Sequence, residues 1–503
     1  MKSITLSLLA LLTLLSCQPK EQTEAKQKTI ICGQVSNFDQ IAEHDFIELF
    51  YQDLLEGQIK RTEDINEKGE FRFELDLDYP AEFYLNYSGL LTYYMSPGDS
   101  LFFAISEQCK LVTTHSYAEE AAFYKVSGSS MKMNTDLEVY EALYRAYTDR
   151  TWALRDSMIK TCTPDEYRSF IEDSYQEWID EVAEFNIENN ISQSFQKWIA
   201  NELKFAQWEE LMRYRWMHPY KNKKDINAFM FSIPDEYYNF LDDWDKANKK
   251  QLEYKSYLGF LHEYHNFNYQ KATESLGDDL ELLYTNNFSQ FVDTLKKAFI
   301  QEENRYMKDV LISKLYFMFL NSKEYHKIKD VFDASLIEDM DLRKKVQEKY
   351  DYERNLYENP KFAAGSKLNQ LAVENDFIQE LIKSYPDKVL YLDFWAPWCG
   401  PCMEEMPYAN NIKKQLEGKD VVFVYLANRC EEASWKATIA EKKIEGEHYR
   451  LTDKQFAHLS EIFSVTGIPH FAIIDKSGHV ANEHAPRPSS GDQLVEMLDG
   501  YLN

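Results

Sequence analysis

Short runs of alternating hydrophobic and polar residues fill the chain from residue 29 to about 115, a pattern typical of β-strands. Turn-forming stretches at residues 67–69 (Glu-Lys-Gly) and 96–99 (Ser-Pro-Gly-Asp) separate these runs. Because short strands at this spacing are typical of two packed sheets, the pattern predicts a small antiparallel β-sandwich over residues 29–115. The clearest strand-length runs are residues 30–35, 46–50, 71–75 and 83–87.

From residue 118 to 357 the hydrophobic positions recur every three or four residues, which is the spacing of one helix face. Glycine and proline rarely interrupt this stretch. It predicts an all-α domain over residues 118–357, in which the aromatic stripe is better explained as core than as a cofactor site. A spacer or a partner-binding surface is its expected use. The clearest stripes are Leu137, Tyr140, Leu143, Tyr144 and Tyr147, then Phe170, Tyr175, Trp178, Ile179 and Val182.

Pro360 ends the helical stretch, because the residue before a proline is driven out of the helical region. Beyond it, residues 361–503 have the order of a βαβ unit followed by a ββα unit. This order predicts an α/β domain with a mixed central sheet flanked by helices, so the whole chain is expected to be a multidomain α+β protein. The predicted helices are 374–384, 399–416, 432–442, 454–463 and 491–502, and the predicted strands are 389–396, 421–427, 471–475 and one after a turn at 475–478.

The N-terminus has the pattern of an export signal. Lys2 precedes an apolar run at residues 4–15, which is too short to span a bilayer, and a Leu-Leu-Ser-Cys sequence ends at Cys17. This segment resembles a bacterial lipoprotein signal, which implies that residues 1–16 are a signal peptide and that Cys17 is lipid-modified. A plain secretory signal is the alternative.

The lipoprotein resemblance also implies a location. Residues 17–28 are polar and predict a flexible tether that reaches roughly 35 Å when extended. The implied protein is held by its lipid anchor in the cell envelope of a Gram-negative bacterium and faces the periplasm. Gln18 favours the outer membrane over the inner, because the aspartate associated with inner-membrane retention is absent at that position.

Composition narrows the class of partners. Of the 503 residues, 44% are hydrophobic and 28% are charged, as in globular proteins of about three domains. The 56 basic and 84 acidic residues give a net charge of −28, which repels phosphate backbones and argues against nucleic acid as a partner. Solubility explains the acidic excess.

Two of the seven cysteines have a spacing that carries chemistry. Cys399 and Cys402 stand in the first turn of a predicted helix that follows a buried strand. Unpaired N–H groups and the helix dipole favour a thiolate at Cys399, which can attack a disulfide in another molecule. Cys402 lies one helical turn away and can displace it, so the pair forms a redox disulfide. Pro401 is tolerated at the start of a helix, where its missing N–H is not needed.

The other cysteines carry no such signal. Cys32 and Cys109 lie near the two ends of the β region and could pair, but nothing in the sequence sets their separation. Cys430 follows a predicted strand and is expected to be a free thiol. A zinc site is a poor alternative for the CxxC, because no second CxxC or histidine pair supplies the remaining ligands.

The segment at residues 395–402 (Trp-Ala-Pro-Trp-Cys-Gly-Pro-Cys) closely resembles the thioredoxin active site, and its surroundings resemble the TlpA-type branch of envelope thiol–disulfide reductases. The resemblance covers roughly residues 365–503 and implies a thioredoxin fold. It implies that Asp393, on the strand beneath the site, accepts the proton of Cys402. It also makes Glu405 a candidate proton relay, although a glutamate in the first turns of a helix is ordinary dipole complementation.

Substrate contacts follow from the same resemblance. Gly467, Ile468 and Pro469 match the cis-proline loop, in which the backbone of Ile468 pairs with the substrate chain, and Trp398 contacts substrate beside the cysteines. Residues 96–101 resemble the end of a small β domain that often precedes thioredoxin-like domains in Gram-negative lipoproteins. One departure is the helical pattern of residues 372–386, where TlpA-type domains usually open with a β-hairpin.

The implied activity is reduction of protein disulfides without a cofactor or metal. The Gly-Pro pair between the cysteines resembles thioredoxin, whose potential near −270 mV makes it a reductant. Disulfide-bearing envelope proteins would be the substrates, and a membrane thiol donor would supply electrons. The alternatives are a peroxiredoxin-like peroxidase and a ligand- or partner-binding lipoprotein with an accessory redox domain.

Overall fold

The computed structural model describes residues 27–36, 46–87, 90–106, 124–226, 230, 232–242, 244–246, 248–274, 276–277, 279–370 and 377–502. The predicted signal peptide, Cys17, most of the tether and Cys109 lie outside these residues. The chain forms two compact units. The first comprises Met1–Trp244 with Asn248–Tyr264, and the second comprises Asp245–Ala247 with His265–Asn503. The boundary crosses the stretch predicted to be one helical domain.

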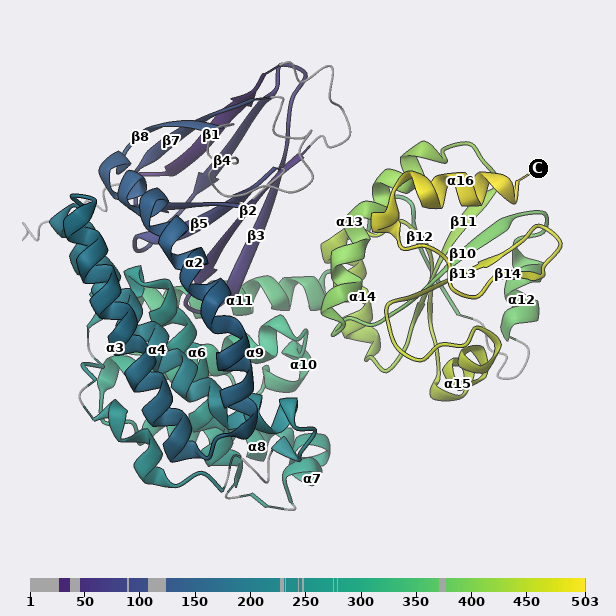
Figure 1. The fold of residues 1–503 in the computed structure, drawn as a ribbon. Helices are drawn as coiled ribbons and strands as arrows, with labels where there is room; N and C mark the ends of the chain where they lie inside the picture. The colour runs from purple at the N-terminus through teal and green to yellow at the C-terminus, as the bar shows by residue number, and fades with distance from the viewer. Residues whose placement is uncertain are drawn as a thin grey trace, which may run out of the picture. The chain divides into compact units, whose positions relative to one another are not determined.

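Two four-stranded sheets open the first unit (Figure 1). Their inward side chains, among them Ile31, Leu49, Phe73 and Phe83, belong to one buried cluster. Neighbouring strands in these two sheets run antiparallel except β1 and β7, which run parallel and so correct the all-antiparallel prediction. The first sheet has the order β4 (Glu70–Leu75), β1 (Thr29–Val35), β7 (Ser100–Ile105) and β8 (Tyr124–Gly128), and the second has β3 (Gly57–Asp64), β2 (Phe46–Asp53), β5 (Ala81–Asn86) and β6 (Leu90–Met95).

Strand β8 lies within the stretch that the sequence assigned to helix from residue 118. It pairs with β7 and places Tyr124 in the β core, so the first helix begins only at Met131. The sequence also missed β3, which is almost entirely exposed and therefore lacks a hydrophobic alternation.

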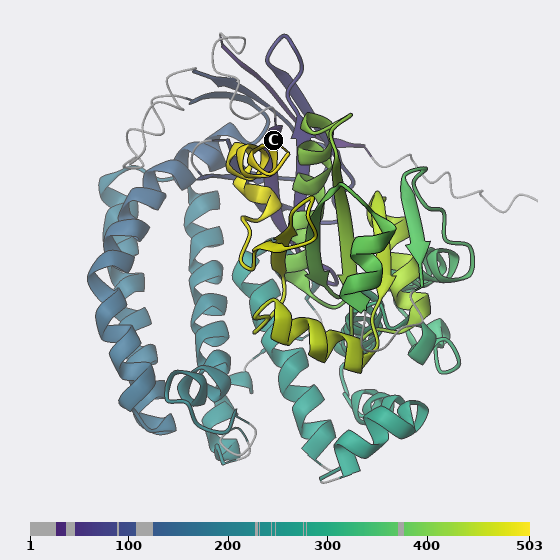
Figure 2. The ribbon, with the colours of Figure 1, turned by 90° about the vertical axis from the view of Figure 1, so that its right-hand side faces the viewer.

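Long helices complete the first unit, and Figures 1 and 2 both show α2, α3 and α4 alongside one another. The N-terminus of α3 is capped as a capping box by Thr163 and Glu166, with Pro164 in the first turn. Most of the aromatic stripe is buried, including Tyr140, Tyr147 and Trp178. The helices are α2 (Met131–Thr161), α3 (Pro164–Glu188), α4 (Gln193–Lys221), η3 (Asp235–Leu241), η4 (Lys249–Glu253) and the start of α6 (Lys255–Glu274).

The second unit begins with helices that precede the C-terminal sheet. Their core centres on α9, where Leu311, Ile312 and Leu315 are fully buried. These helices are the end of α6, then α7 (Asp279–Asn286), α8 (Phe288–Ile300), α9 (Arg305–Asn321), α10 (Tyr325–Ile328), η5 (Ala334–Leu336) and α11 (Met340–Glu358).

A six-stranded mixed sheet forms the C-terminal part of the second unit. Its order is β14-β13-β10-β11-β12-β9, with β10 at the centre and buried throughout. β10 runs parallel to β11 and antiparallel to β13. The strands are β9 (Ser366–Asn369), β10 (Val389–Trp395), β11 (Val421–Ala427), β12 (Gly446–Arg450), β13 (His470–Ile474) and β14 (Val480–Asn482).

Helices cover both faces of this sheet (Figure 1). Tyr391 and Trp395 of β10 belong to the core on one face, and Leu392 belongs to the core on the other. The first face is covered by α13 (Gly400–Gln415), α14 (Glu432–Lys442) and α16 (Asp492–Gly500), and the second by α12 (Phe377–Ser384) and α15 (Asp453–Ile462). The arrangement agrees with the predicted α/β domain.

The sequence reading missed β9 and β12, which pair with each other at one end of the sheet. Both are short and carry polar side chains such as Lys367 and Glu447, so neither has the hydrophobic run of β10. Among the described residues, none of the helices combines the length and apolar character needed to cross a bilayer.

Candidate active site

The two cysteines of the CxxC stand where β10 passes into α13. Cys399 is the N-cap of α13, and its Sγ accepts a hydrogen bond from the backbone N–H of Cys402 at 3.2 Å. The structure contains the disulfide between them. Cys399 is 5% exposed and Cys402 is 1% exposed, so Cys399 is the outer sulfur. Because its Sγ caps free N–H groups at the positive end of a helix, a thiolate there is stabilised after reduction.

Trp398 forms an exposed aromatic surface beside the cysteines. Its side chain is 53% exposed, and its Nε1 donates a hydrogen bond to the backbone oxygen of Arg429 at 2.9 Å. This bond holds the exposed indole in place at the protein surface, and its contact with substrate stays a prediction.

Asp393 lies beneath the site on β10. It stands between Tyr391 and Trp395, so its side chain points to the face covered by α13. The residue is 4% exposed, and its Oδ1 has no hydrogen-bond partner among the described residues. Burial raises the pKa of Asp393 to about 8. The positive charge of Lys413 opposes this shift, and the negative charge of Glu405 adds to it. A carboxyl with such a pKa exchanges protons near neutral pH.

Lys413 and Tyr425 interact electrostatically with Asp393, and His448 packs on Tyr425; the sequence identified none of the three as part of the site. Burial lowers the pKa of Lys413 to about 8, although Glu445 and Asp393 oppose the shift. The Lys413 ammonium lies 4.9 Å from the centre of the Tyr425 ring. The His448 ring stacks on the same Tyr425 ring, with 4.9 Å between the ring centres, and burial lowers the pKa of His448 to about 4, so it is neutral. Lys413 gave no sequence signal, because lysines on helices are usually solvated.

Glu405 is buried and has specific partners. Its carboxylate accepts hydrogen bonds from the backbone N–H and the hydroxyl of Ser489, both at 2.9 Å. Arg487 lies 3.8 Å from it. Glu405 therefore attaches the short helix η6 (Pro488–Ser490) to α13, a positioning role, while its charge contributes to the raised pKa of Asp393. Its role as a proton relay stays a prediction.

The Ile468–Pro469 peptide bond is cis, and it immediately precedes β13. In the β10–β13 pairing Phe394 stands opposite His470, so the same register places Pro469 level with Trp395, at the end of the strand that leads to Cys399. Ile468 packs against the cores on both sheet faces. The structure thus brings the predicted loop to the cysteine edge of the sheet.

The remaining described cysteines are free thiols. Burial raises the pKa of Cys430 to about 12, so this thiol stays protonated and unreactive, as expected from its sequence context. Burial also raises the pKa of Cys162. No cluster of three histidine, cysteine or carboxylate groups able to hold a metal occurs in the described part of the chain.

A disulfide at the start of the helix that follows the central strand, with a buried carboxyl beneath it and a cis-proline loop beside it, defines a thioredoxin-like domain. Residues 387–480 match the family model described as thioredoxin-like. Several matched relatives are named thiol–disulfide oxidoreductase, which together with the thioredoxin-like domain supports an oxidoreductase.

Three comparisons show the extent of the likeness. The thiol-disulfide oxidoreductase ResA of Bacillus cereus is 28% identical over 121 residues, which are 24% of this chain and 65% of that protein. Thioredoxin 1 of Nostoc sp. is 46% identical over 46 residues, which are 9% of this chain and 41% of that protein. The solved thioredoxin domain of a thiol-disulfide oxidoreductase from Bacteroides vulgatus is 23% identical, with a TM-score of 0.22, and the match covers 24% of this chain and 84% of that one.

Proposed function

We propose that this protein is a TlpA-type disulfide reductase of the bacterial cell envelope, held to a membrane through a lipid on Cys17. The observation that supports it most is the Cys399–Cys402 pair at the start of α13, with the buried carboxyl of Asp393 beneath it. The named activity of the relatives agrees with it, over the C-terminal domain alone.

The first step is an attack by the Cys399 thiolate on a disulfide of the substrate protein. A bond forms between Cys399 and one substrate sulfur, and the other substrate sulfur leaves as a thiolate that takes a proton from water. The outer position of Cys399 and its place at the helix N-terminus suit it to this attack.

The second step transfers the proton of Cys402 to the Asp393 carboxylate. The Cys402 thiolate then attacks Cys399, which releases the second substrate sulfur and forms the Cys399–Cys402 disulfide. Two electrons have passed from the dithiol to the substrate. A pKa of about 8 leaves a fraction of Asp393 deprotonated at pH 7, enough to receive the proton. A membrane thiol donor then reduces the pair again.

Gly400 and Pro401 favour reduction over oxidation as the direction. This pair between the cysteines is that of thioredoxin, whose potential near −270 mV makes it a reductant. A measured potential of the Cys399–Cys402 couple above about −150 mV would instead show an oxidant.

Trapping with Cys402→Ala tests the enzymatic proposal. Without the resolving thiol, mixed disulfides on Cys399 should persist, and non-reducing gels followed by mass spectrometry would identify the trapped envelope proteins. The matched control is Cys430→Ala, which removes a protonated, half-buried thiol and should trap nothing. Absence of adducts, together with absence of insulin reduction by the wild-type chain, would contradict the proposal.

The proposed anchor has its own test. Cys17→Ala should move the protein from the membrane fraction to the soluble periplasmic fraction, and it should abolish incorporation of radiolabelled palmitate. Cys32→Ala serves as control and should change neither. A Cys17→Ala protein that still takes up palmitate would refute the anchor.

A further inference from the structure

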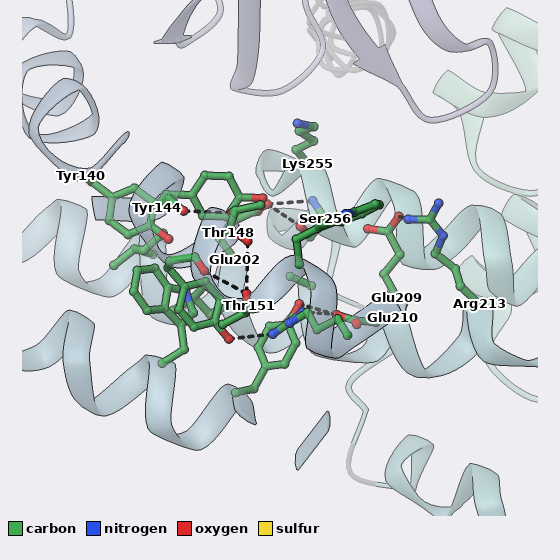
Figure 3. A pocket seen from close by; sticks show the side chains of 18 of the residues that line it. Tyr140, Tyr144, Thr148, Thr151, Glu202, Glu209, Glu210, Arg213, Lys255 and Ser256 are labelled. Atoms are coloured by element: carbon green, nitrogen blue, oxygen red, sulfur yellow. Dashed lines mark hydrogen bonds and ion pairs between the residues drawn. The ribbon is translucent and has the colours of Figure 1, made fainter. Parts of the chain in front are cut away.

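The first unit contains a cavity of about 680 Å³ that the proposed redox chemistry does not use. It lies among helices α2, α3 and α4, with Lys255 and Ser256 at the start of α6 and Glu82 and Tyr84 of β5 completing its wall (Figure 3). The volume is that of a site for a small organic molecule.

Aromatic rings form much of the wall. Tyr140 and Tyr144 of α2 point into the cavity from one side (Figure 3), and Trp178 and Trp198 line it from α3 and α4. Such faces bind apolar groups and also attract cations through their negative π-systems.

In one polar corner of the cavity, the charged groups are paired and hydrogen-bonded with one another. The Glu210 carboxylate lies 2.5 Å from a guanidinium nitrogen of Arg155 and accepts hydrogen bonds from the hydroxyls of Tyr167 at 3.3 Å and Tyr175 at 3.1 Å. Because the charges of Arg155 and Glu210 compensate each other, this corner has no free charge among the described residues for a ligand to pair with.

A second corner is incomplete. Glu202 Oε1 accepts hydrogen bonds from the backbone N–H of Ser256 at 3.0 Å and from its hydroxyl at 2.6 Å. Glu202 Oε2 is buried, and nothing in the described residues donates to it. Trp198 stands one helical turn earlier, and its buried Nε1 has no acceptor there either. A buried carboxylate oxygen without a partner is costly, and a ligand N–H that donated to Glu202 Oε2 would remove that cost.

The same corner carries an excess of negative charge. Glu82, Glu141 and Glu202 line it, and two cations oppose them: Lys255 beside Glu82, and Arg145, which lies 3.9 Å from Glu141. Lys255 Nζ lies 3.5 Å from Glu82 and donates to the hydroxyl of Tyr84. Burial raises the pKa of Glu202 to about 7 and that of Glu141 above its ordinary value, and in both cases the charge of Glu82 adds to the shift.

From this arrangement we propose that the cavity binds a protonated amine carried on an aromatic or aliphatic body. The ammonium N–H donates to Glu202 Oε2, and the body lies among Tyr140, Tyr144 and Trp198. A neutral or anionic ligand of the same shape would leave the carboxylates uncompensated and is disfavoured.

Calorimetric titration of the full-length chain with 2-phenylethylamine and with 2-phenylethanol tests this inference. The two probes have nearly the same shape and differ in charge. The amine should bind at least about tenfold more tightly, because a hydrogen bond between charged groups is stronger than a neutral one. Equal affinities, or binding of neither probe, would overturn the proposal, as would binding of Ca²⁺ that excludes the amine.

The pH dependence gives a readout that needs no variant. The cation requires ionised Glu202, so the amine affinity should rise as the pH increases from 6 to 8, while the affinity for the alcohol stays constant. A flat profile for the amine would contradict the assignment to Glu202. The charged and titratable groups that interact electrostatically with Glu202 are Glu82, Tyr140, Tyr254 and Lys255.

Two variants locate the site. Glu202→Gln should weaken the affinity for the amine by about tenfold and leave the affinity for the alcohol unchanged. The control Glu184→Gln replaces an exposed glutamate on α3 and should change neither affinity. Ala206→Leu fills the cavity wall without altering its charge and should weaken both probes. Thermal unfolding of each variant checks that it is folded. Unaltered amine binding by folded Glu202→Gln would refute the site. Redox activity is independent of these results, since none of the residues belongs to the C-terminal domain.

Discussion

Asp393 shows how one side chain sets the chemistry of its neighbours. Its place on β10 is decided by the alternation of the strand, which directs it to the face of α13 and the cysteines. Burial, more than any neighbouring charge, then determines its pKa. The identity of the residue could be read from the sequence by resemblance, but Lys413, which opposes the shift, could not, because only packing brings α13 over β10.

A stability measurement checks the raised pKa of Asp393. The carboxyl keeps its proton to about pH 8 in the folded chain but loses it near pH 4 when unfolded, so its contribution to folding is lost as the pH rises between these values. Asp393→Asn removes this loss and should raise the free energy of unfolding at pH 7 by on the order of 3 kcal/mol, with little gain at pH 4.

Denaturant unfolding at a series of pH values measures the effect. Asp387→Asn is the control, because Asp387 is exposed and has a left-handed φ of 59°, which asparagine tolerates. A gain for Asp393→Asn that did not vary with pH would be inconsistent with a raised pKa.

At the scale of elements, the start of α13 is held in place by tertiary contacts that cannot be predicted from the sequence of the helix. Glu405 lies on the buried side of the helix and bonds to Ser489, which is 84 positions further along the chain. The sequence allowed two explanations of Glu405, complementation of the helix dipole and a catalytic role, because each requires only a glutamate in an early turn of the helix. The tertiary contact supplies a third explanation, attachment of η6.

Glu405→Ala should lower the free energy of unfolding by about 2 kcal/mol, because it leaves the donors of Ser489 without their charged acceptor. Glu404→Ala, an exposed neighbour on the same helix, should change it by less than about 0.5 kcal/mol. The pH profile of insulin reduction distinguishes the roles. A profile that keeps all its titration steps, with the Asp393 step moved to lower pH because the charge of Glu405 is gone, agrees with positioning. Loss of one titration step would show that Glu405 transfers protons.

At the scale of the whole molecule, the thioredoxin-like domain belongs to a larger compact unit that includes the preceding helices. Lys323, in the turn after α9, contacts Glu353 of α11 at 2.8 Å and Glu441 of α14 at 2.9 Å. Glu353 is fully buried. Although burial opposes it, the charge of Lys323 holds the pKa of Glu441 below its ordinary value. This ion pair links the helices to the redox domain.

Lys323→Met should lower the free energy of unfolding of this unit by about 2 kcal/mol, since the buried carboxylate of Glu353 loses its nearest cation and is left with Lys349 at 3.2 Å. Methionine keeps the length of the side chain, so packing is largely conserved. Lys344→Met removes an exposed pair with Glu348 on the same helix and should cost less than about 1 kcal/mol. Equal midpoints of urea unfolding for the two variants would show that the Lys323 cluster contributes nothing.

The sequence by itself determined the elements whose patterns are local. The run that became β10, the CxxC at the start of α13, and the stripes of α2 and α3 are recognisable because period and capping depend on neighbours in the chain. Tertiary structure decided the rest. β8, β9 and β12 are strands because partners accept their hydrogen bonds, and the cluster around Asp393 and the cavity beside Glu202 exist because distant segments exclude water together.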